Sequence, residues 1–290
     1  MTTSRWCQRW RRHAMSWQYA DPDQRFTGRG YDVQEIDYRT ALDYIQAHHY
    51  LASMGADVKR YGLFHAGELV GVAVYGNPSN ARVLTNWLPD LAPYTQSLTL
   101  LRVVLADRVP GNGESWLLRQ CRDRLTADGV LGSVTFADPM ALHDASGRRV
   151  FKGHTGIMYQ GDNWTFCGVA TARPVLVTAT GQRLDARTLQ KIRAQESGHE
   201  GAERTLIQLG APVMQAGENP ASWLRRALDA IQPRTVRHTG CYRYVRAHRR
   251  DVAIVHRGRR VRHDPAAYPK PSDDLMSLLD TDAAASQEEE

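Results

Sequence analysis

The feature that most constrains the fold of this chain is a strand, glycine turn, helix and strand that follow one another between Leu98 and Gly168. The sequence predicts a strand over Leu98–Ala106, a glycine turn over 109–113, a helix over Glu114–Ala127 and a second strand over Ser133–Asp138. This succession is typical of an α/β fold, whose chemistry gathers where strands end and helices begin. We therefore expect the active site in this segment.

Size and cysteine usage restrict the class of protein. A chain of 290 residues with 42% hydrophobic ones can bury a full core in one or two domains. The four cysteines stand far apart without a Cys-x-x-Cys pair, which predicts free thiols in a reducing compartment. No apolar run approaches the ~20 residues that span a bilayer, and no signal core is evident. We expect a cytoplasmic protein with no membrane partner.

Charge is distributed unevenly along the chain, whose net charge is +6. From Arg234 to Arg262 there are ten arginines and one acidic residue, Asp251. In residues 272–290, by contrast, every charged residue is acidic. The arginine block predicts a polyanionic partner. The acidic tail either screens that block until the partner arrives or is a solvated, disordered end, and both interpretations stay open.

The N-terminal segment Arg5–Trp17 mixes arginines with Trp6, Trp10 and Trp17. Their spacings of four and seven place the three tryptophans on one face of a predicted helix. We favour packing of this face on the core over contact with nucleic acid. After a Gly/Asp/Pro-rich link, an amphipathic helix is predicted over Tyr38–Tyr50, and a hairpin follows with strands at Arg60–Phe64 and Leu69–Tyr75.

The glycine turn itself is a candidate cofactor loop. Arg108, Gly111 and Gly113 fit a pattern in which glycines let backbone amides at a helix N-terminus approach a pyrophosphate. Pro110 has no amide to donate, and Glu114 would repel phosphate in the first helical turn. The alternative is a glycine turn followed by a capped helix.

The second half of the segment is more informative. Asp138-Pro139 ends an apolar strand, so the carboxylate is expected at the edge of the sheet where open α/β sheets place ligands. A hydroxyl-bearing helix follows through His154-Thr-Gly-Ile-Met-Tyr159-Gln160, and then Asn163-Trp164 and a strand over Thr165–Thr171.

These motifs together resemble one known family. The ordered set consists of His49-Tyr50 at a helix end, a hairpin, Leu101-Arg102-Val103-Val104, Ser115-Trp116, Phe136-Ala137-Asp138-Pro139, 154–160 and Asn163-Trp164. Over residues 35–175, and at a later strand around 241–245, the chain resembles the phage Mom family of DNA-modification proteins, which are divergent relatives of GNAT acyltransferases.

The resemblance implies an α/β fold with a GNAT-like mixed central sheet, flanking helices and a helical insert before the last strand. It also implies conversion of DNA adenine to an N6-substituted, carbamoylmethyl-type adenine, which protects phage DNA from restriction in the cytoplasm of the infected bacterium. The functional positions that it carries over are His49, Tyr50, Arg102, Ser115, Asp138 and Tyr159. Two departures are an insertion over Met140–Gly153 and Cys241-Tyr242 in place of the family's histidine region.

The residues also suggest chemistry of their own. Adenine N6 is a poor nucleophile, so Asp138 would orient or deprotonate it while Tyr159 returns a proton to a leaving group. Alternatively, His49, Tyr50 and Asp138 would hold an iron-type metal. The cofactor stays open between such a metal and an acetyl-CoA-like donor.

The expected partner is double-stranded DNA with its target adenine flipped out of the stack. Tyr50, Trp87 and Trp164 are candidate surfaces for the base. Candidate residues for the DNA backbone are Arg243, Arg246, Arg249 and Arg250.

We expect five parts in the chain. These are a basic, aromatic N-terminal extension (1–30), a catalytic core (31–180), a helical insert (181–237), a final strand with the basic block (238–264) and a disordered acidic tail (265–290). In the insert, Asp185 and Asn219-Pro220 are helix N-cap signals.

Two other functions stay open. One is a GNAT enzyme that acetylates a small-molecule or protein amine with acetyl-CoA, which the pattern Arg108, Gly111 and Gly113 favours. The other is a non-enzymatic DNA-binding protein, which rests on charge alone.

Overall fold

The computed structural model of the protein describes residues 8–11, 16–19, 26–51, 53–151 and 153–270. The chain divides into two compact units. The described parts of the larger unit lie within residues 8–139, 154–169 and 241–270, and the smaller unit contains residues 140–153 and 170–240.

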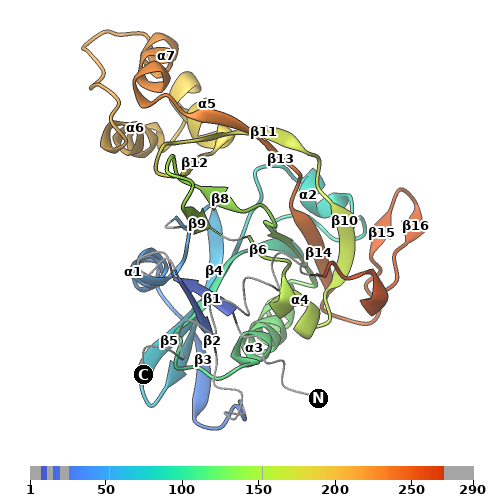
Figure 1. Ribbon diagram of the computed structural model, residues 1–290. Helices are drawn as coiled ribbons and strands as arrows, with labels where there is room; N and C mark the ends of the chain where they lie inside the picture. The colour runs from blue at the N-terminus through green and yellow to red at the C-terminus, as the bar shows by residue number, and fades with distance from the viewer. Residues whose placement is uncertain (1–7, 12–15, 20–25, 52, 152, 271–290) are drawn as a thin grey trace. The chain divides into compact units, whose positions relative to one another are not determined.

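The larger unit is built on a seven-stranded mixed sheet with strand order β10-β14-β7-β6-β5-β4-β3 (Figure 1). Its strands are β3 (Tyr31–Glu35), β4 (Asp57–His65), β5 (Glu68–Gly76), β6 (Ser97–Leu105), β7 (Gly132–Ala137), β10 (Thr165–Val169) and β14 (Tyr242–Ala247). Its helices are α1 (Tyr38–His48), α2 (Arg82–Thr85), α3 (Gly113–Ala127) and α4 (Ile157–Gly161). The α/β fold with a mixed sheet and flanking helices, predicted from the sequence, is confirmed.

The predicted hairpin is present as β4 and β5. The loop between the paired residues His65 and Glu68 is Ala66-Gly67, and both of its residues have positive φ, 50° and 81°. Two left-handed residues make a turn whose twist matches that of paired strands.

Strand β5 is buried on both faces because its side chains alternate between two helical layers. Val72 and Val74 pack with Ala41 and Ile45 of α1. Ala73 and Tyr75 belong instead to the core cluster that contains Leu117 and Cys121 of α3. The sheet is therefore covered by α1 on one side and by α3 on the other.

The parallel pair β6–β7 is short. Only Ser97–Thr99 of β6 pair with β7, where their partners are Gly132–Val134. Strand β6 itself continues to Leu105 as the partner of β5. The β5–β6 register shifts at Leu101, between Val74↔Arg102 and Tyr75↔Leu100. Such a bulge bends the strand locally, and β6 leaves β7 beyond this point.

The N-terminal helix predicted over Arg5–Trp17 is wrong for the described residues. There the chain forms two paired strands, β1 (Gln8–Arg11) and β2 (Ser16–Tyr19), with Trp10 opposite Trp17. Trp10 and Trp17, seven residues apart, suit one helical face and are also register partners in this strand pair, so their spacing in the sequence cannot distinguish the two structures. Residues 1–7, 12–15 and 20–25 lie outside the described ranges.

The smaller unit holds the predicted helical insert. It contains α5 (Ala186–Ala194), α6 (His199–Gln208) and α7 (Pro220–Ile231), packed around the buried Ile192, Leu206 and Trp223. Both predicted caps are confirmed, because Asp185 accepts from Arg187 N and Asn219 accepts from Ala221 N and Ser222 N. The unit's strands are β8 (Leu142–His143), β9 (Arg149–Phe151), β11 (Arg173–Val177), β12 (Arg183–Leu184) and β13 (Arg234–His238).

The C-terminal segment is ordered further than the sequence predicts. A short two-stranded sheet, β15 (Val255–His256) and β16 (Arg259–Arg260), is followed by the 3-10 turn Pro265–Ala267. The Tyr268 hydroxyl donates to Trp164 O at 2.8 Å, so disorder from residue 265 onward is wrong as far as Lys270. The acidic residues 271–290 lie outside the described part. Within the described ranges, no helix has the length and apolar character that crossing a bilayer would require.

His248 links the end of β14 to the start of β7. Its Nδ1 lies 2.9 Å from Val130 O and its Nε2 lies 3.0 Å from Ser133 Oγ. A neutral imidazole donates from one nitrogen and accepts at the other, which this pair of partners satisfies. Removal from water lowers the pKa of His248 to about 4.

We predict that His248→Gln makes folding less sensitive to mild acid. Between pH 6.5 and 4 the unfolded chain protonates this histidine while the folded chain does not, so stability falls as pH falls. The free energy of unfolding should drop by up to about 1.4 kcal/mol per pH unit for each such histidine. Urea unfolding of both proteins at neutral and mildly acidic pH measures this slope. An unchanged slope in the variant would contradict the assignment.

Candidate functional site

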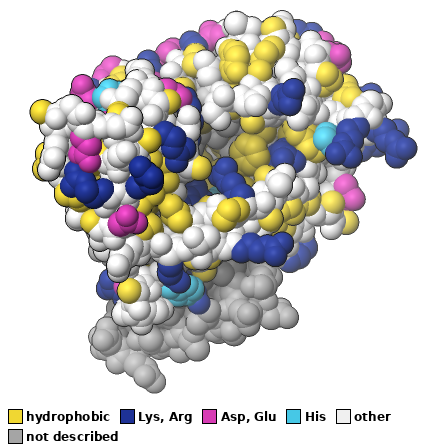
Figure 2. Space-filling view, turned by 90° about the horizontal axis from the view of Figure 1, so that it is seen from above, with side chains coloured by type: hydrophobic (Ala, Val, Ile, Leu, Met, Phe, Trp, Pro, Cys, Tyr) yellow, Lys and Arg dark blue, Asp and Glu magenta, His cyan; other side chains and the backbone are white. Residues whose placement is uncertain are grey.

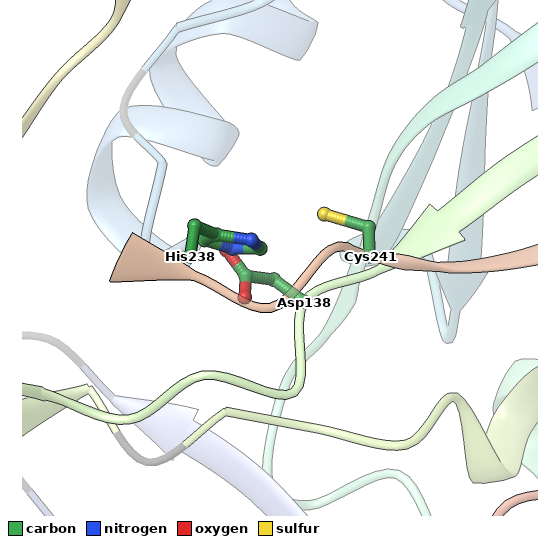
Figure 3. A group of neighbouring side chains, drawn as sticks. All are labelled: Asp138, His238 and Cys241. Carbon is green, nitrogen blue, oxygen red and sulfur yellow. The ribbon is translucent and has the colours of Figure 1, made fainter. Parts of the chain in front are cut away.

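Asp138 and Cys241 face each other where two neighbouring strands of the larger unit meet. β14 pairs antiparallel with β7 and Tyr242 is opposite Ala137, so Cys241 comes next to Asp138. A carboxylate oxygen of Asp138 and the Cys241 sulfur lie within 4.8 Å of each other. Figure 3 shows these two side chains at the strand ends. The third side chain drawn there belongs to His238, the last residue of β13 in the smaller unit.

His154 brings the downstream segment to Asp138. Its backbone N–H donates to Asp138 O at 2.7 Å, which fixes the start of the segment that leads to α4. Burial in low-polarity surroundings lowers the pKa of the His154 ring to about 4, against the opposing effect of the Asp138 charge. The ring is therefore neutral at physiological pH, and one of its nitrogens can accept a hydrogen bond.

Tyr50 approaches the same histidine from the end of α1. Its hydroxyl lies 3.4 Å from His154 Nε2, and the two rings meet edge to face. His49, the C-cap residue of α1, stacks on Tyr50 with ring centroids 4.4 Å apart. The His49 Nδ1 accepts from Leu51 N at 2.9 Å, so one ring nitrogen is used to hold this loop.

Arg102 ties the loop that carries Tyr50 to the sheet. The side chain follows the bulge of β6, and its Nε donates to Ser53 O at 2.7 Å. A second nitrogen, Nη1, donates to Leu101 O at 2.6 Å. Arg102 thus fixes the position of the loop in addition to bringing a positive charge to the site.

Tyr159 is a buried member of this site, with 5% of its surface exposed. Its ring packs with Trp164 and Tyr244 at centroid distances of 5.6 and 5.4 Å. Burial raises the pKa of its hydroxyl, while a hydrogen bond with Thr135 and the charge of Arg102 lower it. The net shift is upward, so Tyr159 remains a protonated phenol at neutral pH.

Ser115 occupies a different place. It lies on α3, and a Cβ on Gly161 of α4 would come 2.9 Å from the Ser115 hydroxyl oxygen. The small residues at these two positions let α3 and α4 pack closely. The structure therefore places Ser115 in a helix contact, and its predicted functional role stays a prediction.

The glycine turn has a packing explanation. A Cβ on Gly113 would come 2.6 Å from Val109 and 3.1 Å from Leu105, so glycine lets α3 begin against β6. Arg108 forms an ion pair with Glu68 at the hairpin of β4 and β5. The N-cap residue of α3 is Asn112. Its backbone is left-handed, with φ 75°, and its side chain makes no capping hydrogen bond to the helix. Cofactor binding by Arg108, Gly111 and Gly113 stays a prediction.

Two of the four arginines predicted to contact DNA are half-buried and have partners within the fold. The Arg243 guanidinium lies 4.9 Å from the Trp87 ring centroid and donates to Cys167 O, and Arg246 donates to Asn163 O. Burial lowers the pKa of both groups. Arg249 pairs with Asp251, and Arg250 is exposed.

The predicted base-stacking surfaces also differ in exposure. Trp164 is 2% exposed and its Nε1 donates to Asp162, and Trp87 is 7% exposed. Both are core residues, because the apolar faces of the sheet need large side chains there. Tyr50, which is half-buried, is the remaining aromatic candidate of the three.

The sequence indicates chemistry at Asp138 and in the segment from His154 to Trp164, but neither His154 nor Cys241 was given a role of its own. The signal for His154 was its position directly before the Thr-Gly of the motif that follows Asp138-Pro139. Cys241 was noted only as a departure, yet its place just before β14 puts it beside Asp138. A thiol and a carboxylate are both metal-ligand types. An iron-type metal stays a prediction.

Comparison with known proteins gives one family. Residues 30–270 match the model of the Mom protein family. No curated protein matches the chain.

Similar solved structures are acetyltransferases at low identity. An IAA acetyltransferase from Bacillus cereus is 9% identical, with a TM-score of 0.33 over 75% of this chain and 99% of that chain. A GNAT family acetyltransferase from Elizabethkingia anophelis with acetyl-CoA bound is 10% identical, with a TM-score of 0.31 over 76% and 99%. An arylalkylamine N-acetyltransferase 7 from the mosquito Aedes aegypti is 9% identical, with a TM-score of 0.36 over 83% and 93%.

We predict that Gly156→Ala lowers the free energy of unfolding by more than Gly129→Ala does. Both glycines are left-handed, at φ 82° and 83°, so each substitution costs about 1–2 kcal/mol of backbone strain. A Cβ on Gly156 would lie 2.7 Å from Tyr244 and 2.8 Å from Tyr159, whereas nothing lies within 4 Å at Gly129. Overpacking adds about 1–3 kcal/mol. Denaturant unfolding of both variants measures the difference; equal losses would contradict the close packing.

Proposed function

The chain belongs to the Mom protein family, and from that premise we propose that it is a DNA-modifying enzyme that converts adenine to an N6-substituted adenine. The observation that carries the proposal is the meeting of Asp138, His154 and Tyr50 at the end of β7. In this proposal these groups would bind the base and move its proton. The product would be a carbamoylmethyl-type adenine that protects phage DNA from restriction in the bacterial host.

Asp138 has the central role in the proposed reaction. The lone pair of adenine N6 is delocalised into the ring, so the amine must lose a proton as it attacks. The Asp138 carboxylate would accept that proton while the new N6–carbon bond forms and the bond from carbon to the leaving group breaks. Asp138 is half-buried, so part of the residue is exposed to solvent.

Tyr50 and His154 would handle protons beside Asp138. Because the His154 ring is neutral, its Nε2 can accept a hydrogen bond from the Tyr50 hydroxyl. When the substrate is bound, the single O–H of this tyrosine would turn from His154 to the purine or to the leaving group and donate there. The ring of Tyr50 also offers a surface for a flipped base, which enzymes that act on base atoms require.

Arg102 and Tyr159 would stabilise charge. Arg102 lies on β6 near Tyr159, where its charge opposes the rise in the pKa of that hydroxyl. A guanidinium and a neutral phenol together provide fixed donors for negative charge that develops on the leaving group. The burial of Tyr159 supports a positioning role more strongly than direct transfer to a solvent-exposed group.

One observation favours acetyl transfer as a second candidate. Beyond Thr99, β6 leaves its parallel partner and carries on to Leu105. An extended ligand can pair with such a strand edge, as the pantetheine arm of an acetyl-CoA-like donor would. Acetyl-CoA binding, with acetyl transfer to a small-molecule or protein amine and no change in DNA, would favour this candidate.

We predict that expression of this protein in bacteria makes DNA resistant to restriction enzymes with adenine in their sites. Nucleoside mass spectrometry of that DNA should show a heavier deoxyadenosine. Loss of one acid–base group typically costs about 10²–10⁴-fold in rate, so Asp138→Asn should abolish the heavier nucleoside and Tyr50→Phe should reduce it strongly.

The matched control for Tyr50→Phe is Tyr38→Phe, since Tyr38 is 50% exposed at the start of α1. That variant should modify DNA as the wild type does. Unmodified nucleosides from well-expressed wild-type protein, with any phage partner gene present, would refute the proposed function.

A further inference from the structure

A short basic hairpin follows the last strand of the central sheet. We call residues 255–262 the arginine hairpin; it contains β15 and β16, with Val255 opposite Arg260 and His256 opposite Arg259. The loop is Arg257-Gly258, whose φ values of 50° and 76° are both left-handed. This two-residue turn makes a tight, twisted ribbon.

The base of the arginine hairpin is anchored in the larger unit. The His256 ring stacks on Trp87 with centroids 4.1 Å apart and an interplanar angle of 6°. Val255 N donates to Trp87 O at 2.9 Å, and Val261 N donates to Ile254 O at 2.8 Å. Because Trp87 and Ile254 belong to one buried cluster, the hairpin is held rigidly at its base.

The outer part of the hairpin carries concentrated positive charge. Its four arginines, Arg257, Arg259, Arg260 and Arg262, are all exposed. Residues 252–263 contain no acid. The nearest acidic residues in the sequence lie on either side of the hairpin and have partners outside it. Asp251 forms an ion pair with Arg249, and Asp264 accepts a hydrogen bond from Ala266 N. Within the described part of the chain, none of the four guanidiniums has an ion-pair partner.

Figure 2 shows a group of Lys and Arg side chains projecting from the right-hand edge of the surface, the side on which Figure 1 draws β15 and β16. Consecutive residues of a strand point to opposite faces, so Arg259 and Arg260 present charge on both faces of the ribbon. A two-stranded ribbon fits the major groove of B-DNA, where phosphates flank it on both sides.

We propose that the arginine hairpin binds the phosphate backbone of double-stranded DNA and positions the duplex for this protein. The inference rests on the proposed function, because an enzyme that acts on DNA adenine must hold the duplex. It also explains why Arg243 and Arg246 can have internal partners: the DNA-binding charge lies on the hairpin that follows them.

The test removes three charges from the hairpin and, separately, three exposed charges from other parts of the larger unit. The first variant is R257Q/R259Q/R260Q. The control is R29Q/R39Q/R119Q, whose positions are exposed and lie near β3, on α1 and on α3. Binding to a labelled duplex of about 30 base pairs is followed by fluorescence anisotropy from about 50 to 200 mM salt.

We predict that the hairpin variant flattens the salt dependence of binding. Each lost phosphate contact reduces the slope of log K against log salt by about 0.9, so the slope should fall by about 2–3. Affinity at about 100 mM salt should fall at least tenfold. The control should keep the wild-type slope, and both variants should keep the wild-type melting temperature.

Equal slopes for wild type and hairpin variant would overturn the inference. An equal loss in the control would also overturn it, because binding would then reflect net charge alone. A hairpin variant that loses binding to single-stranded RNA or anionic vesicles, but not to the duplex, would assign the surface to another polyanion and refute the proposal. Binding is measured without modification, so unmodified nucleosides would refute the proposed function while leaving this result intact.

Discussion

The pairing of β14 with β7 is the interaction on which the rest of the structure depends. Strand β14 follows β7 only after the chain has passed through the smaller unit, yet the two strands pair from Ala137 to Gly132 without a register shift. This register puts Cys241 beside Asp138 and turns Tyr244 toward Tyr159. It directs Arg243 to the opposite face of the sheet, against Trp87. The arginine hairpin follows β14 in the chain. A slip of one residue would exchange all of these faces.

Exclusion of water sets the chemistry of the site. His154 is held neutral by its surroundings, and Tyr159 is held as a protonated phenol. Arg102 is the nearby cation, and its hydrogen bonds to Ser53 and Leu101 keep it in place. The site therefore combines one carboxylate, one neutral base and phenolic donors on separate segments that the sheet brings together.

Local signals predicted most of the central elements correctly. The hairpin of β4 and β5, helix α3 and both caps of the smaller unit follow from turn chemistry, apolar periodicity and capping residues. The N-terminal strands were missed because tryptophans at spacings of four and seven suit a helical face as well as cross-strand pairs. Tyr268 was missed because a single aromatic residue between Pro265 and Pro269 gives no local sign of its hydrogen bond to Trp164.

By itself, the sequence determined the fold class, the family resemblance and the position of Asp138 at a strand end, since each depends on residues close together in the chain. Tertiary structure alone decided which distant residues meet. It placed His154 against Tyr50, gave Arg243 and Arg246 internal partners, and left the arginines of residues 255–262 exposed. The physical reason is that burial and long-range strand register arise only when separate segments pack, and no local pattern of residues records them.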